Sequence, residues 1–325
     1  MHRKKRIIIS RDIYIAAGCF WGTAAYFKRV PGVLKVEEGY ANGKTENTSY
    51  EELDQSGHAL TVHITYDATY LSLAEILERF YRIIDLFSVN EQGEDEGSQY
   101  RTGIYFTNTQ DEKLIRYSIE QLESRISRKT AIEVEQLSNW VIAEDYHHNY
   151  LEKNPGGYCH IALEEVSRPL WDKDYSVNTN ELKDELDPNI YHIVVEKGTE
   201  EAHSHPYLHE SRLGIYVDIL SGQPLFSSID RYDSECGWPS FTKGISTDAL
   251  VYELDDSHNM KRMEVLTRNS RSHLGHVFND GPSERGGLRY CINGASIRFV
   301  PRDDMENEGY QAFLPFIHES ISEAD

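Results

Sequence analysis

The pattern of apolar residues changes partway along the chain, and this change constrains the fold more than any other feature. Up to about residue 163, strand-like runs alternate with segments whose apolar residues recur at helical spacing. Beyond a charged, weakly periodic stretch, short strand-like runs are separated by turn residues. We therefore predict an α+β N-terminal domain over residues 1–165, with a mixed sheet and flanking helices, a linker over 166–190, and a mainly β C-terminal domain over 191–325.

Local patterns predict the individual elements. Residues 13–17 indicate a buried strand that turns at Gly18 and Cys19 into a helix over 20–27. Residues 61–66 alternate as a strand, and the helical pattern that begins at residue 73 follows Ser72, which can cap a helix. Further predictions are a helix over 111–128, strands near 132–134 and after Trp140, and strands over 214–218, 224–226, 250–253 and 263–266.

Length and composition exclude several classes of protein. The 325 residues fit two domains of roughly 150 residues, and a hydrophobic share of 39% is enough to build cores. The formal charge of -21 argues against a nucleic-acid partner, which would favour clustered Lys and Arg. No run approaches the roughly 20 apolar residues of a membrane span, so no membrane partner is expected. The basic start is followed by too short an apolar stretch for a signal peptide, so we expect a cytoplasmic protein.

The four cysteines are the residues best suited to chemistry. Cys19, Cys159, Cys236 and Cys291 are too few for a disulfide-stapled scaffold. None belongs to a Cys-x-x-Cys pair, which excludes a zinc ribbon and a thioredoxin-type motif. They are therefore either inert core residues or individually placed reactive thiols.

Cys19 lies where a predicted strand ends and a helix begins. Free backbone N–H groups and the helix dipole favour a thiolate at such a position. The next residues, Phe20 and Trp21, form an aromatic wall that suits a small apolar group. The alternative is a buried structural cysteine.

Cys291 lies in a predicted strand whose alternation places Arg289, Cys291 and Asn293 on one face. The guanidinium favours a thiolate, and the amide can bind a polar ligand. His273 and His276 lie upstream, and a cysteine with a histidine is a common pairing of nucleophile and acid. The alternatives for these histidines are surface residues or a metal pair.

Cys159 and Cys236 both lie in turn-rich surroundings. Cys159 follows two glycines, and Cys236 precedes Gly237-Trp238-Pro239. A mobile thiol can reach a second sulfur, as a resolving cysteine must. The pattern is consistent with one rigid and one mobile cysteine in each half.

The first region resembles A-type methionine sulfoxide reductases over about residues 13–163. The matching motifs are Gly18-Cys19-Phe20-Trp21-Gly22, Gly39-Tyr40-Ala41, Gly57-His58-Ala59, Gly97-Ser98-Gln99-Tyr100-Arg101, Ala143-Glu144-Asp145-Tyr146-His147 and Gly157-Tyr158-Cys159. The resemblance implies that Cys19 is the nucleophile for the S epimer and Cys159 the resolving cysteine. The remaining implied roles are contact with the substrate methyl group for Phe20 and Trp21, and binding of the sulfoxide oxygen for Tyr50, Asp95 and Tyr100.

The second region resembles B-type methionine sulfoxide reductases over about residues 190–315. The matching motifs are Gly214-Ile215-Tyr216-Val217-Asp218, Cys236-Gly237-Trp238-Pro239-Ser240-Phe241, His273-Leu274-Gly275-His276-Val277-Phe278 and Leu288-Arg289-Tyr290-Cys291-Ile292-Asn293. The resemblance implies that Cys291 is the nucleophile for the R epimer and Cys236 the resolving cysteine. It also implies site roles for Trp238, which would hold the methyl group, and for His273, His276, Arg289 and Asn293, with His276 as the proton donor.

The chain as a whole thus resembles a bacterial-type fusion of the two reductases. Such an enzyme would reduce methionine sulfoxide, free or in proteins, by thiolate attack, sulfenic acid formation and an intradomain disulfide. With no fused thioredoxin motif, the resemblance implies thioredoxin as a separate reductant. Many B-type members bind zinc through two Cys-x-x-Cys pairs, so this chain resembles the zinc-free branch, and no metal or other cofactor is expected.

One position departs from the A-type pattern. The family has Gly-His-Ala-Glu, in which the Glu is the general acid, and this chain has Gly57-His58-Ala59-Leu60. Leu60 cannot donate a proton, and general acid help is worth about 10²- to 10⁴-fold. We therefore expect the N-terminal activity to be impaired.

Two other functions compete with this one. A thiol peroxidase or disulfide isomerase would share cysteine pairs, but it would not need a Trp beside one thiol and a His-x-x-His element near the other. A metal-binding module would draw on His203, His205 and His209, with His147 and His148 elsewhere. Histidines around Pro206 are more typical of a polar loop.

Overall fold

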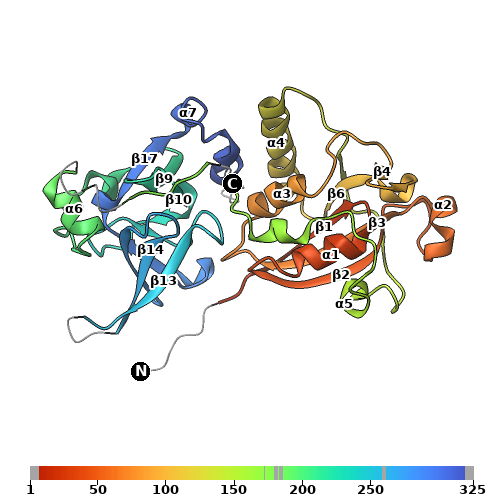
Figure 1. The fold of residues 1–325 in the computed structure, drawn as a ribbon, viewed down its shortest axis with the longest axis horizontal. Helices are drawn as coiled ribbons and strands as arrows, with labels where there is room; N and C mark the ends of the chain where they lie inside the picture. The colour runs from red at the N-terminus through yellow and green to blue at the C-terminus, as the bar shows by residue number, and fades with distance from the viewer. Residues whose placement is uncertain (1–6, 172, 179–181, 183–185, 258–260, 319–325) are drawn as a thin grey trace. The chain divides into compact units, whose positions relative to one another are not determined.

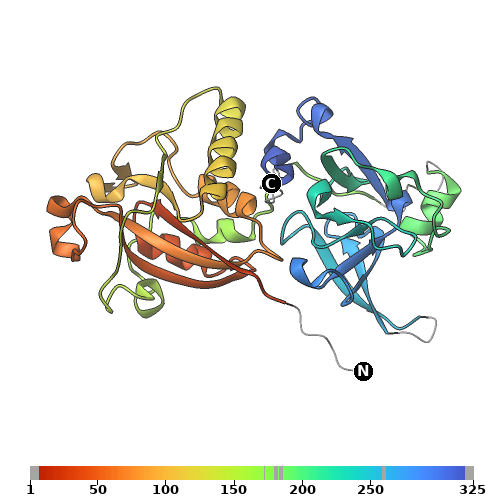
Figure 2. The ribbon, with the colours of Figure 1, turned by 180° about the vertical axis from the view of Figure 1, so that it is seen from behind.

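The chain forms two compact units in the computed structural model (Figure 1, Figure 2). The structure describes residues 7–171, 173–178, 182, 186–257 and 261–318. The N-terminal unit spans Ser10–Arg168, and the C-terminal unit begins at Pro169. The predicted limits of domains and linker stay a prediction, although the division falls inside the charged stretch 166–190.

The N-terminal unit is built on a six-stranded mixed sheet in the order β7-β6-β1-β3-β2-β8. Its neighbouring strands are antiparallel except for β6 and β7, which are parallel. This confirms the predicted α+β fold. The strands are β1 (Ser10–Ala17), β2 (Val33–Ala41), β3 (Ala59–Asp67), β6 (Thr102–Phe106), β7 (Glu133–Gln136) and β8 (Trp140–Ile142), with a small separate pair of β4 (Glu91–Gln92) and β5 (Asp95–Glu96).

Two helices in this unit, α3 and α4, begin at residues whose side chains cap them. The Ser72 hydroxyl accepts a hydrogen bond from Glu75 N (3.1 Å), as predicted, and the Asn108 side chain caps the longest helix by accepting from Gln110 N (2.9 Å). The elements are α1 (Phe20–Phe27), α2 (Leu53–Ser56), α3 (Leu73–Arg82), α4 (Thr109–Ile126) and α5 (Tyr150–Lys153), with 3-10 turns η1 (Tyr50–Glu52), η2 (Ser98–Tyr100) and η3 (Leu163–Ser167).

The core lies on one face of this sheet. Ile13 and Ile15 of β1 are fully buried in the same cluster as Phe27 of α1, Ile76 of α3 and Ile115 of α4. Alternate residues of β1 enter a second, smaller cluster instead, because successive side chains of a strand point to opposite faces. Burying each large apolar side chain contributes about 1.5–3 kcal/mol. The helices thus fix the end of β1 firmly, just before Cys19.

The C-terminal unit consists mainly of strands, as predicted. Two sheets have the orders β10-β9-β17 and β11-β12-β16-β15-β14-β13, and β13 and β14 form a projecting hairpin (Figure 1). The strands are β9 (Gly214–Asp218), β10 (Pro224–Ser227), β11 (Arg231–Tyr232), β12 (Ser240–Phe241), β13 (Leu250–Asp255), β14 (Arg262–Thr267), β15 (His273–Phe278), β16 (Arg289–Ile292) and β17 (Ile297–Pro301). The helical elements are α6 (Pro188–Val194), α7 (Arg302–Met305), η5 (Pro206–His209), η6 (Ser228–Asp230), η8 (Ser283–Arg285), η9 (Gly294–Ser296) and η10 (Gln311–Ile317).

In the described part of the chain, no helix combines the length and apolar character that crossing a bilayer requires.

Candidate active sites

Cys19 occupies the turn between β1 and α1, in the N-cap position of the helix. Gly18 has a left-handed φ of +76°, which glycine adopts without strain. The Cys19 thiol is buried, with 6% of the residue exposed, and this burial raises its pKa to about 11. Hydrogen bonds from the Trp21 and Gly22 amides lower the pKa but do not outweigh burial. The helix N-terminus thus favours the thiolate in the predicted direction, but desolvation is the larger effect, so the pKa of Cys19 is raised overall.

The aromatic wall beside Cys19 depends on a histidine that sequence reasoning did not single out for this role. His147 is buried and accepts a hydrogen bond through Nδ1 from Trp21 Nε1 (3.1 Å). The Trp21 ring also stacks on Tyr150, with ring centroids 3.7 Å apart. The Phe20 ring lies edge-on to His147 at 5.0 Å. His147 therefore fixes the orientation of the two aromatic side chains that follow Cys19.

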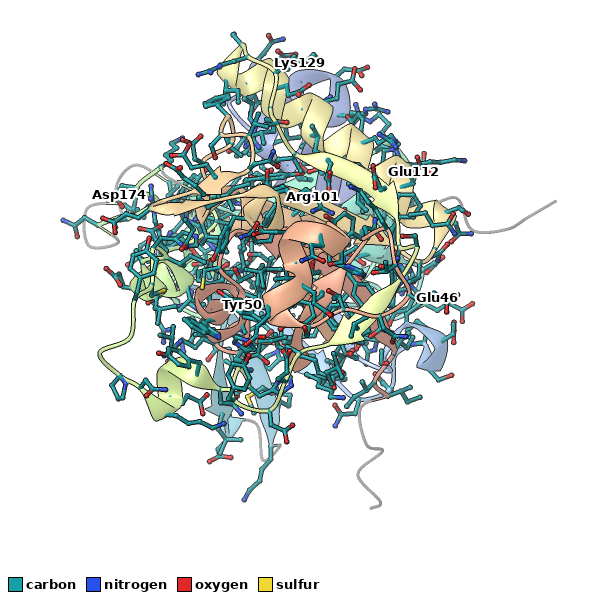
Figure 3. The ribbon with its side chains drawn as sticks, turned by 90° about the vertical axis from the view of Figure 1, so that its right-hand side faces the viewer. Glu46, Tyr50, Arg101, Glu112, Lys129 and Asp174 are labelled. Atoms are coloured by element: carbon teal, nitrogen blue, oxygen red, sulfur yellow. The ribbon has the colours of Figure 1, made fainter. Side chains whose placement is uncertain are left out.

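The predicted polar residues of the N-terminal site come together. Tyr50 is partly exposed on the face of the unit that Figure 3 shows, and its backbone N–H donates to Glu144 (3.0 Å). Burial raises the pKa of Tyr100, and a hydrogen bond with Tyr50 and the charges of Asp95 and Cys19 raise it further. These interactions connect all three predicted oxygen-binding residues with the nucleophile.

Position 60 is an apolar core position. Leu60 lies on β3 directly opposite Tyr40 of β2, and only 2% of it is exposed. The Tyr40 hydroxyl donates a hydrogen bond to Glu144, which brings a carboxylate close to this pair of strand residues. Burial raises the pKa of Glu144, but the hydrogen bonds from Tyr40 and the Tyr50 backbone outweigh it and lower the pKa overall. Glu144 is therefore an ionised acceptor, and Leu60 supplies no acid.

Cys159 lies against the first turn of α1. A Cβ atom added to Gly22 would lie only 2.7 Å from Cys159 Sγ, so the helix needs a glycine here. Gly22 follows Cys19 by three residues and therefore lies on the same face of the helix. Both cysteines are free, and the Cys159 thiol donates to Ile161 O (3.3 Å). The predicted pair thus shares one end of one helix.

In the C-terminal unit the predicted pair is in direct contact. Cys291 of β16 lies opposite His276 of β15 and Ser240 of β12, and its sulfur is 3.4 Å from Cys236 Sγ. Hydrogen bonding from Cys291 and from the Ser234 and Ser240 hydroxyls lowers the pKa of Cys236 to about 4.

Cys291 behaves oppositely within the same pair. Its contact with Cys236 and its burial raise the pKa of Cys291, although Arg289 acts to lower it. Arg289 thus favours the Cys291 thiolate in the predicted direction, but it is outweighed. The Ser234 hydroxyl donates to Cys236 Sγ, and the Ser240 hydroxyl lies 3.4 Å from it, so of the two sulfurs Cys236 is the one whose neighbours favour the thiolate. Arg289 itself forms a two-point ion pair with Asp280, with both contacts at 2.8 Å.

A small pocket opens onto Cys291. Its volume is about 110 Å³, so it can receive only a small group. Three of the predicted site residues, Trp238, His276 and Asn293, line it together with Cys291, whereas His273 and Arg289 do not. The other lining residues are Thr199, Arg262, Gly275 and Phe278.

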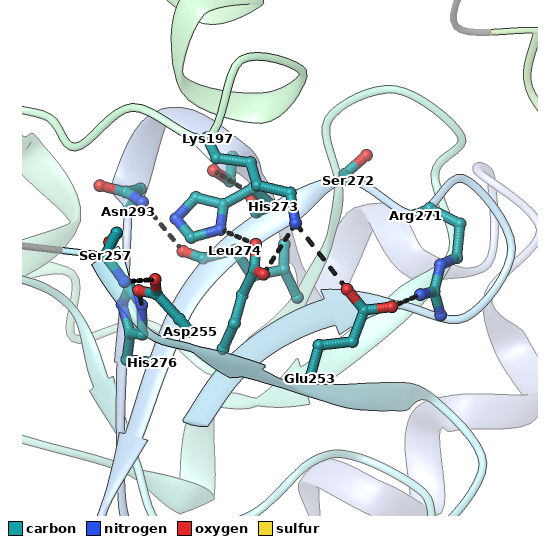
Figure 4. A network of polar contacts seen from close by, with 12 residues as sticks. Lys197, Glu253, Asp255, Ser257, Arg271, Ser272, His273, Leu274, His276 and Asn293 are labelled. Atoms are coloured by element: carbon teal, nitrogen blue, oxygen red, sulfur yellow. Dashed lines mark hydrogen bonds and ion pairs between the residues drawn. The ribbon is translucent and has the colours of Figure 1, made fainter. Parts of the chain in front are cut away.

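Carboxylates hold the two predicted histidines of this site (Figure 4). His276 Nε2 lies 2.7 Å from Asp255 Oδ2, and Asp255 also accepts from Arg262 (2.6 Å). His273 Nδ1 lies 2.7 Å from Glu264 Oε1. Burial lowers the pKa of both imidazoles, and the carboxylates partly counteract this. The hairpin carboxylates thus orient the histidines, while burial favours their neutral form.

Glu200 holds the tryptophan and the amide of this site in place. Its carbonyl accepts from Trp238 Nε1 (3.2 Å), and its N–H donates to Asn293 Oδ1 (3.1 Å). Its carboxylate accepts from the backbone N–H groups of Gly294 (2.6 Å) and Ala295 (2.9 Å). Periodicity and spacing do not reveal Glu200, because its partners lie far along the chain. The side-chain amide of Asn293 forms hydrogen bonds with backbone groups.

The histidines considered as metal ligands make other contacts. His205 accepts a hydrogen bond from Tyr207 N, and His147 and His148 belong to the N-terminal unit. His148 contacts Glu38 at 2.9 Å. Among the described residues, no group of three or more His, Cys, Asp and Glu side chains is placed to hold a metal ion.

Comparison with known proteins separates the chain into the same two regions. The family model for peptide methionine sulfoxide reductase matches residues 11–178, and the model for the SelR domain matches residues 186–301.

Three solved structures each resemble about half of the chain. Mxr1 from Saccharomyces cerevisiae in reduced form is 30% identical, with 50% of this chain and 98% of that chain covered and a TM-score of 0.45. Methionine sulfoxide reductase A of Corynebacterium diphtheriae is 30% identical over 46% of this chain and 77% of its own, with a TM-score of 0.43. Mxr1 in complex with Trx2 is 21% identical, with 43% of this chain and 84% of that chain covered and a TM-score of 0.33.

Proposed function

The chain belongs to the peptide methionine sulfoxide reductase family, and we propose that each of its two units reduces one epimer of methionine sulfoxide at its own pair of cysteines. The S epimer would react at Cys19 in the N-terminal unit. The R epimer would react at Cys291 in the C-terminal unit. The substrate is methionine sulfoxide, free or within a protein.

The pairing of the cysteines carries this proposal. Cys236 and Cys291 are in contact at 3.4 Å, and Cys159 packs against Gly22, three residues from Cys19. Each unit therefore contains a buried or partly buried thiol with a second thiol near it. This arrangement supports formation of a sulfenic acid on one sulfur and its condensation with the other.

At the N-terminal site the substrate methyl group would pack against Phe20 and Trp21. The sulfoxide oxygen would then face Tyr50, Tyr100 and Asp95. Cys19 loses its proton and attacks the sulfoxide sulfur, the oxygen is protonated, and methionine leaves. The cysteine sulfur is oxidised by two electrons to a sulfenic acid, and the substrate sulfur is reduced by two.

At the C-terminal site Trp238 would contact the methyl group. The resting charge on Cys236 must move to Cys291 before attack, and a proton crossing the 3.4 Å contact achieves this. Arg289 favours the charge on Cys291 once the proton has moved. His276 would protonate the departing oxygen, because it lies opposite Cys291 and lines the same pocket.

Both sites would then use their second cysteine in the same way. The thiol of Cys159 or Cys236 attacks the sulfenic sulfur, a disulfide forms, and the hydroxyl leaves as water. An external dithiol reduces the disulfide, and we propose thioredoxin for this role. We also propose that the C-terminal unit works without zinc and that Leu60 slows the N-terminal reaction.

Activity with resolved epimers tests this function. The full-length protein is assayed with each pure epimer of a blocked methionine sulfoxide, with thioredoxin, its reductase and NADPH as the electron supply. We expect Cys19→Ser to abolish reduction of the S epimer only and Cys291→Ser that of the R epimer only, so each variant controls for the other. Loss of both activities in either variant contradicts the assignment.

The resolving cysteines give a second arm of the experiment. Cys159→Ser and Cys236→Ser should each release one methionine per site without reductant but lose turnover driven by thioredoxin. Formation of water from peroxide, with no methionine from methionine sulfoxide, would favour a thiol peroxidase instead.

A further inference from the structure

A histidine directly after the resolving cysteine reaches into the N-terminal site. The His160 side chain is 8% exposed. A Cβ on Gly18, the residue before Cys19, would lie 3.3 Å from His160 Cε1, and a Cβ on Gly93 would lie 2.8 Å from His160 Cβ. Two glycines therefore make room for this ring beside the nucleophile.

The ring faces Asp95. His160 Nδ1 lies 4.0 Å from Asp95 Oδ2. Both ring nitrogens and this carboxylate oxygen are buried, and among the described residues none of them has a partner of good hydrogen-bond geometry, although the Ala17 carbonyl lies near the His160 ring. Because buried polar atoms are normally paired, three such atoms in one place indicate a site for another polar atom. A separation of 4.0 Å is too long for a direct bond but allows one oxygen to contact both groups.

The reaction needs a proton carrier at this place. Cys19 holds its proton at rest, so attack requires an acceptor for that proton. The departing oxygen requires a donor, and Leu60 cannot serve as one. A single group that takes the thiol proton and returns it to the oxygen satisfies both requirements.

We propose that Asp95 and His160 carry this proton together, with Asp95 contacting the sulfoxide oxygen as the catalytic residue and His160 acting through it as a positioning residue. The proton leaves Cys19 Sγ, resides on the pair, and passes to the oxygen that Cys19 acquires. In sum, thiol and sulfoxide become sulfenic acid and thioether, with no outside reductant. The inference rests on the proposed role of Cys19.

Electrostatics support the pairing. Burial lowers the pKa of His160, and Asp95 and the Ala17 carbonyl partly counteract this. Burial raises the pKa of Asp95, Glu94 adds to this, and His160 counteracts it. The two pKa values approach each other, so a proton moves between the groups at a low cost in free energy.

The other ionisable groups around the pair are few. The Tyr158 hydroxyl accepts from Glu94 N (3.1 Å) and lies next to Gly93, and the other ionisable groups near the pair among the described residues include the Glu94 carboxylate, Tyr100, Cys19 and Cys159. The pKa of each cysteine is raised, mainly by burial. A titration seen below the usual range of histidine would therefore belong to the pair.

A single-turnover experiment tests the proposal. Reduced full-length protein is mixed with the S epimer without reductant, and methionine is measured in a quenched-flow instrument. We expect His160→Gln, which keeps a polar side chain but does not titrate, to slow the burst about 10²-fold. The matched control is His63→Gln, because His63 lies on β3 opposite Tyr14 and is paired with Asp12 of β1. This control should keep the wild-type rate, and reduction of the R epimer should not change.

The pH profile separates proton transfer from a structural effect. The pair must be unprotonated to accept the thiol proton, so the wild-type burst rate should fall as pH decreases through a pKa below the usual range of histidine. In His160→Gln this fall should move to lower pH, because the carboxylate then acts alone. A burst within about twofold of wild type, with an unchanged profile, overturns the inference only. A wild-type protein that gives no burst with the S epimer overturns the proposed function as well.

A measurement without turnover keeps the proposal falsifiable if His160→Gln does not fold. Nuclear magnetic resonance gives the pKa of His160 in the full-length protein. The carboxylate of Asp95 raises that pKa, so Asp95→Asn should lower it further. An unchanged pKa overturns the pairing.

Discussion

The two units place the same chemistry on different kinds of backbone. In the C-terminal unit the proposed nucleophile, Cys291, lies on β16, His276 lies opposite on β15, and Asp255 contacts His276 at 2.7 Å from a neighbouring hairpin. In the N-terminal unit Cys19 lies at the turn into α1, and the facing groups, 4.0 Å apart, are Asp95 of the short strand β5 and His160 of the loop after Cys159.

The difference extends to the state of the sulfurs. Burial without a hydrogen-bonded partner thiol raises the pKa of Cys19 to about 11, whereas contact with a second thiol lowers that of Cys236 to about 4. Strand pairing in the C-terminal unit brings the two thiols together before substrate arrives. The N-terminal unit keeps a protonated nucleophile and needs a proton carrier. One reaction can thus start from two opposite resting states.

The largest expected effect concerns the anchored histidine. Asp255→Asn removes the charge that holds His276, and a hydrogen bond to a charged group is worth about 1.5–3 kcal/mol, so reduction of the R epimer should slow about 10- to 100-fold. The alkaline limb of its pH profile should move to lower pH, because His276 must be protonated to act as the donor and Asp255 raises its pKa. Steady-state assays with each epimer measure this.

The control for that variant lies next to it. Asp256→Asn changes an exposed carboxylate of the same hairpin and should leave both activities unchanged. If both variants slow the R epimer equally, the anchoring role of Asp255 is excluded.

Restoring the general acid of the A-type family at position 60 should reduce the difference in reduction rate between the two units. Leu60→Glu should speed reduction of the S epimer about tenfold, because it adds a general acid beside the site. Burial of the new carboxyl should lower the free energy of unfolding by about 1–3 kcal/mol. Leu60→Gln, of the same shape but without an acid, is the control. A Glu variant no faster than the Gln variant shows that Leu60 does not limit the rate.

Chemical modification should detect the difference in ionisation between Cys236 and Cys19. At pH 7 Cys236 is ionised, whereas only about one Cys19 thiol in 10⁴ is ionised. A thiolate of low pKa is a weaker nucleophile, so we expect Cys236 to be alkylated about 3- to 15-fold faster than Cys19. Reaction with iodoacetamide followed by peptide mapping measures it. Raising the pH toward 11 should reduce the advantage, since Cys19 then ionises. Faster modification of Cys19 at pH 7 would contradict the assignment.

The smallest effect concerns the approach of the resolving cysteine. In Gly22→Ala the new Cβ would lie 2.7 Å from Cys159 Sγ, so it should displace that thiol and slow thioredoxin-driven turnover of the S epimer about threefold. The first burst of methionine should keep its rate. Gly156→Ala is the control, because its Cβ would contact nothing within 4 Å. Equal slowing by both variants would indicate a general effect on the loop.

Periodicity was enough to predict the elements that carry the cysteines. The strand before Cys19, the helix after it and the cap at Ser72 follow from neighbouring residues, and the structure has them within a few positions. The predicted strand face of Arg289 and Cys291 follows from the same local rule. His147, Glu200 and Asp255 were not identified for their present roles, because each acts on a residue distant in sequence.

The sequence by itself determined which chemistry the chain can perform, since four isolated cysteines in family motifs specify two thiol reactions. Only the tertiary structure decided where the charge rests. The helix N-terminus at Cys19 and the guanidinium at Cys291 each lower the pKa, as predicted, but burial outweighs the first effect, and burial together with the contact with Cys236 outweighs the second. Ionisation depends on burial and on atoms within a few ångströms in space, whereas sequence patterns report only the neighbours along the chain.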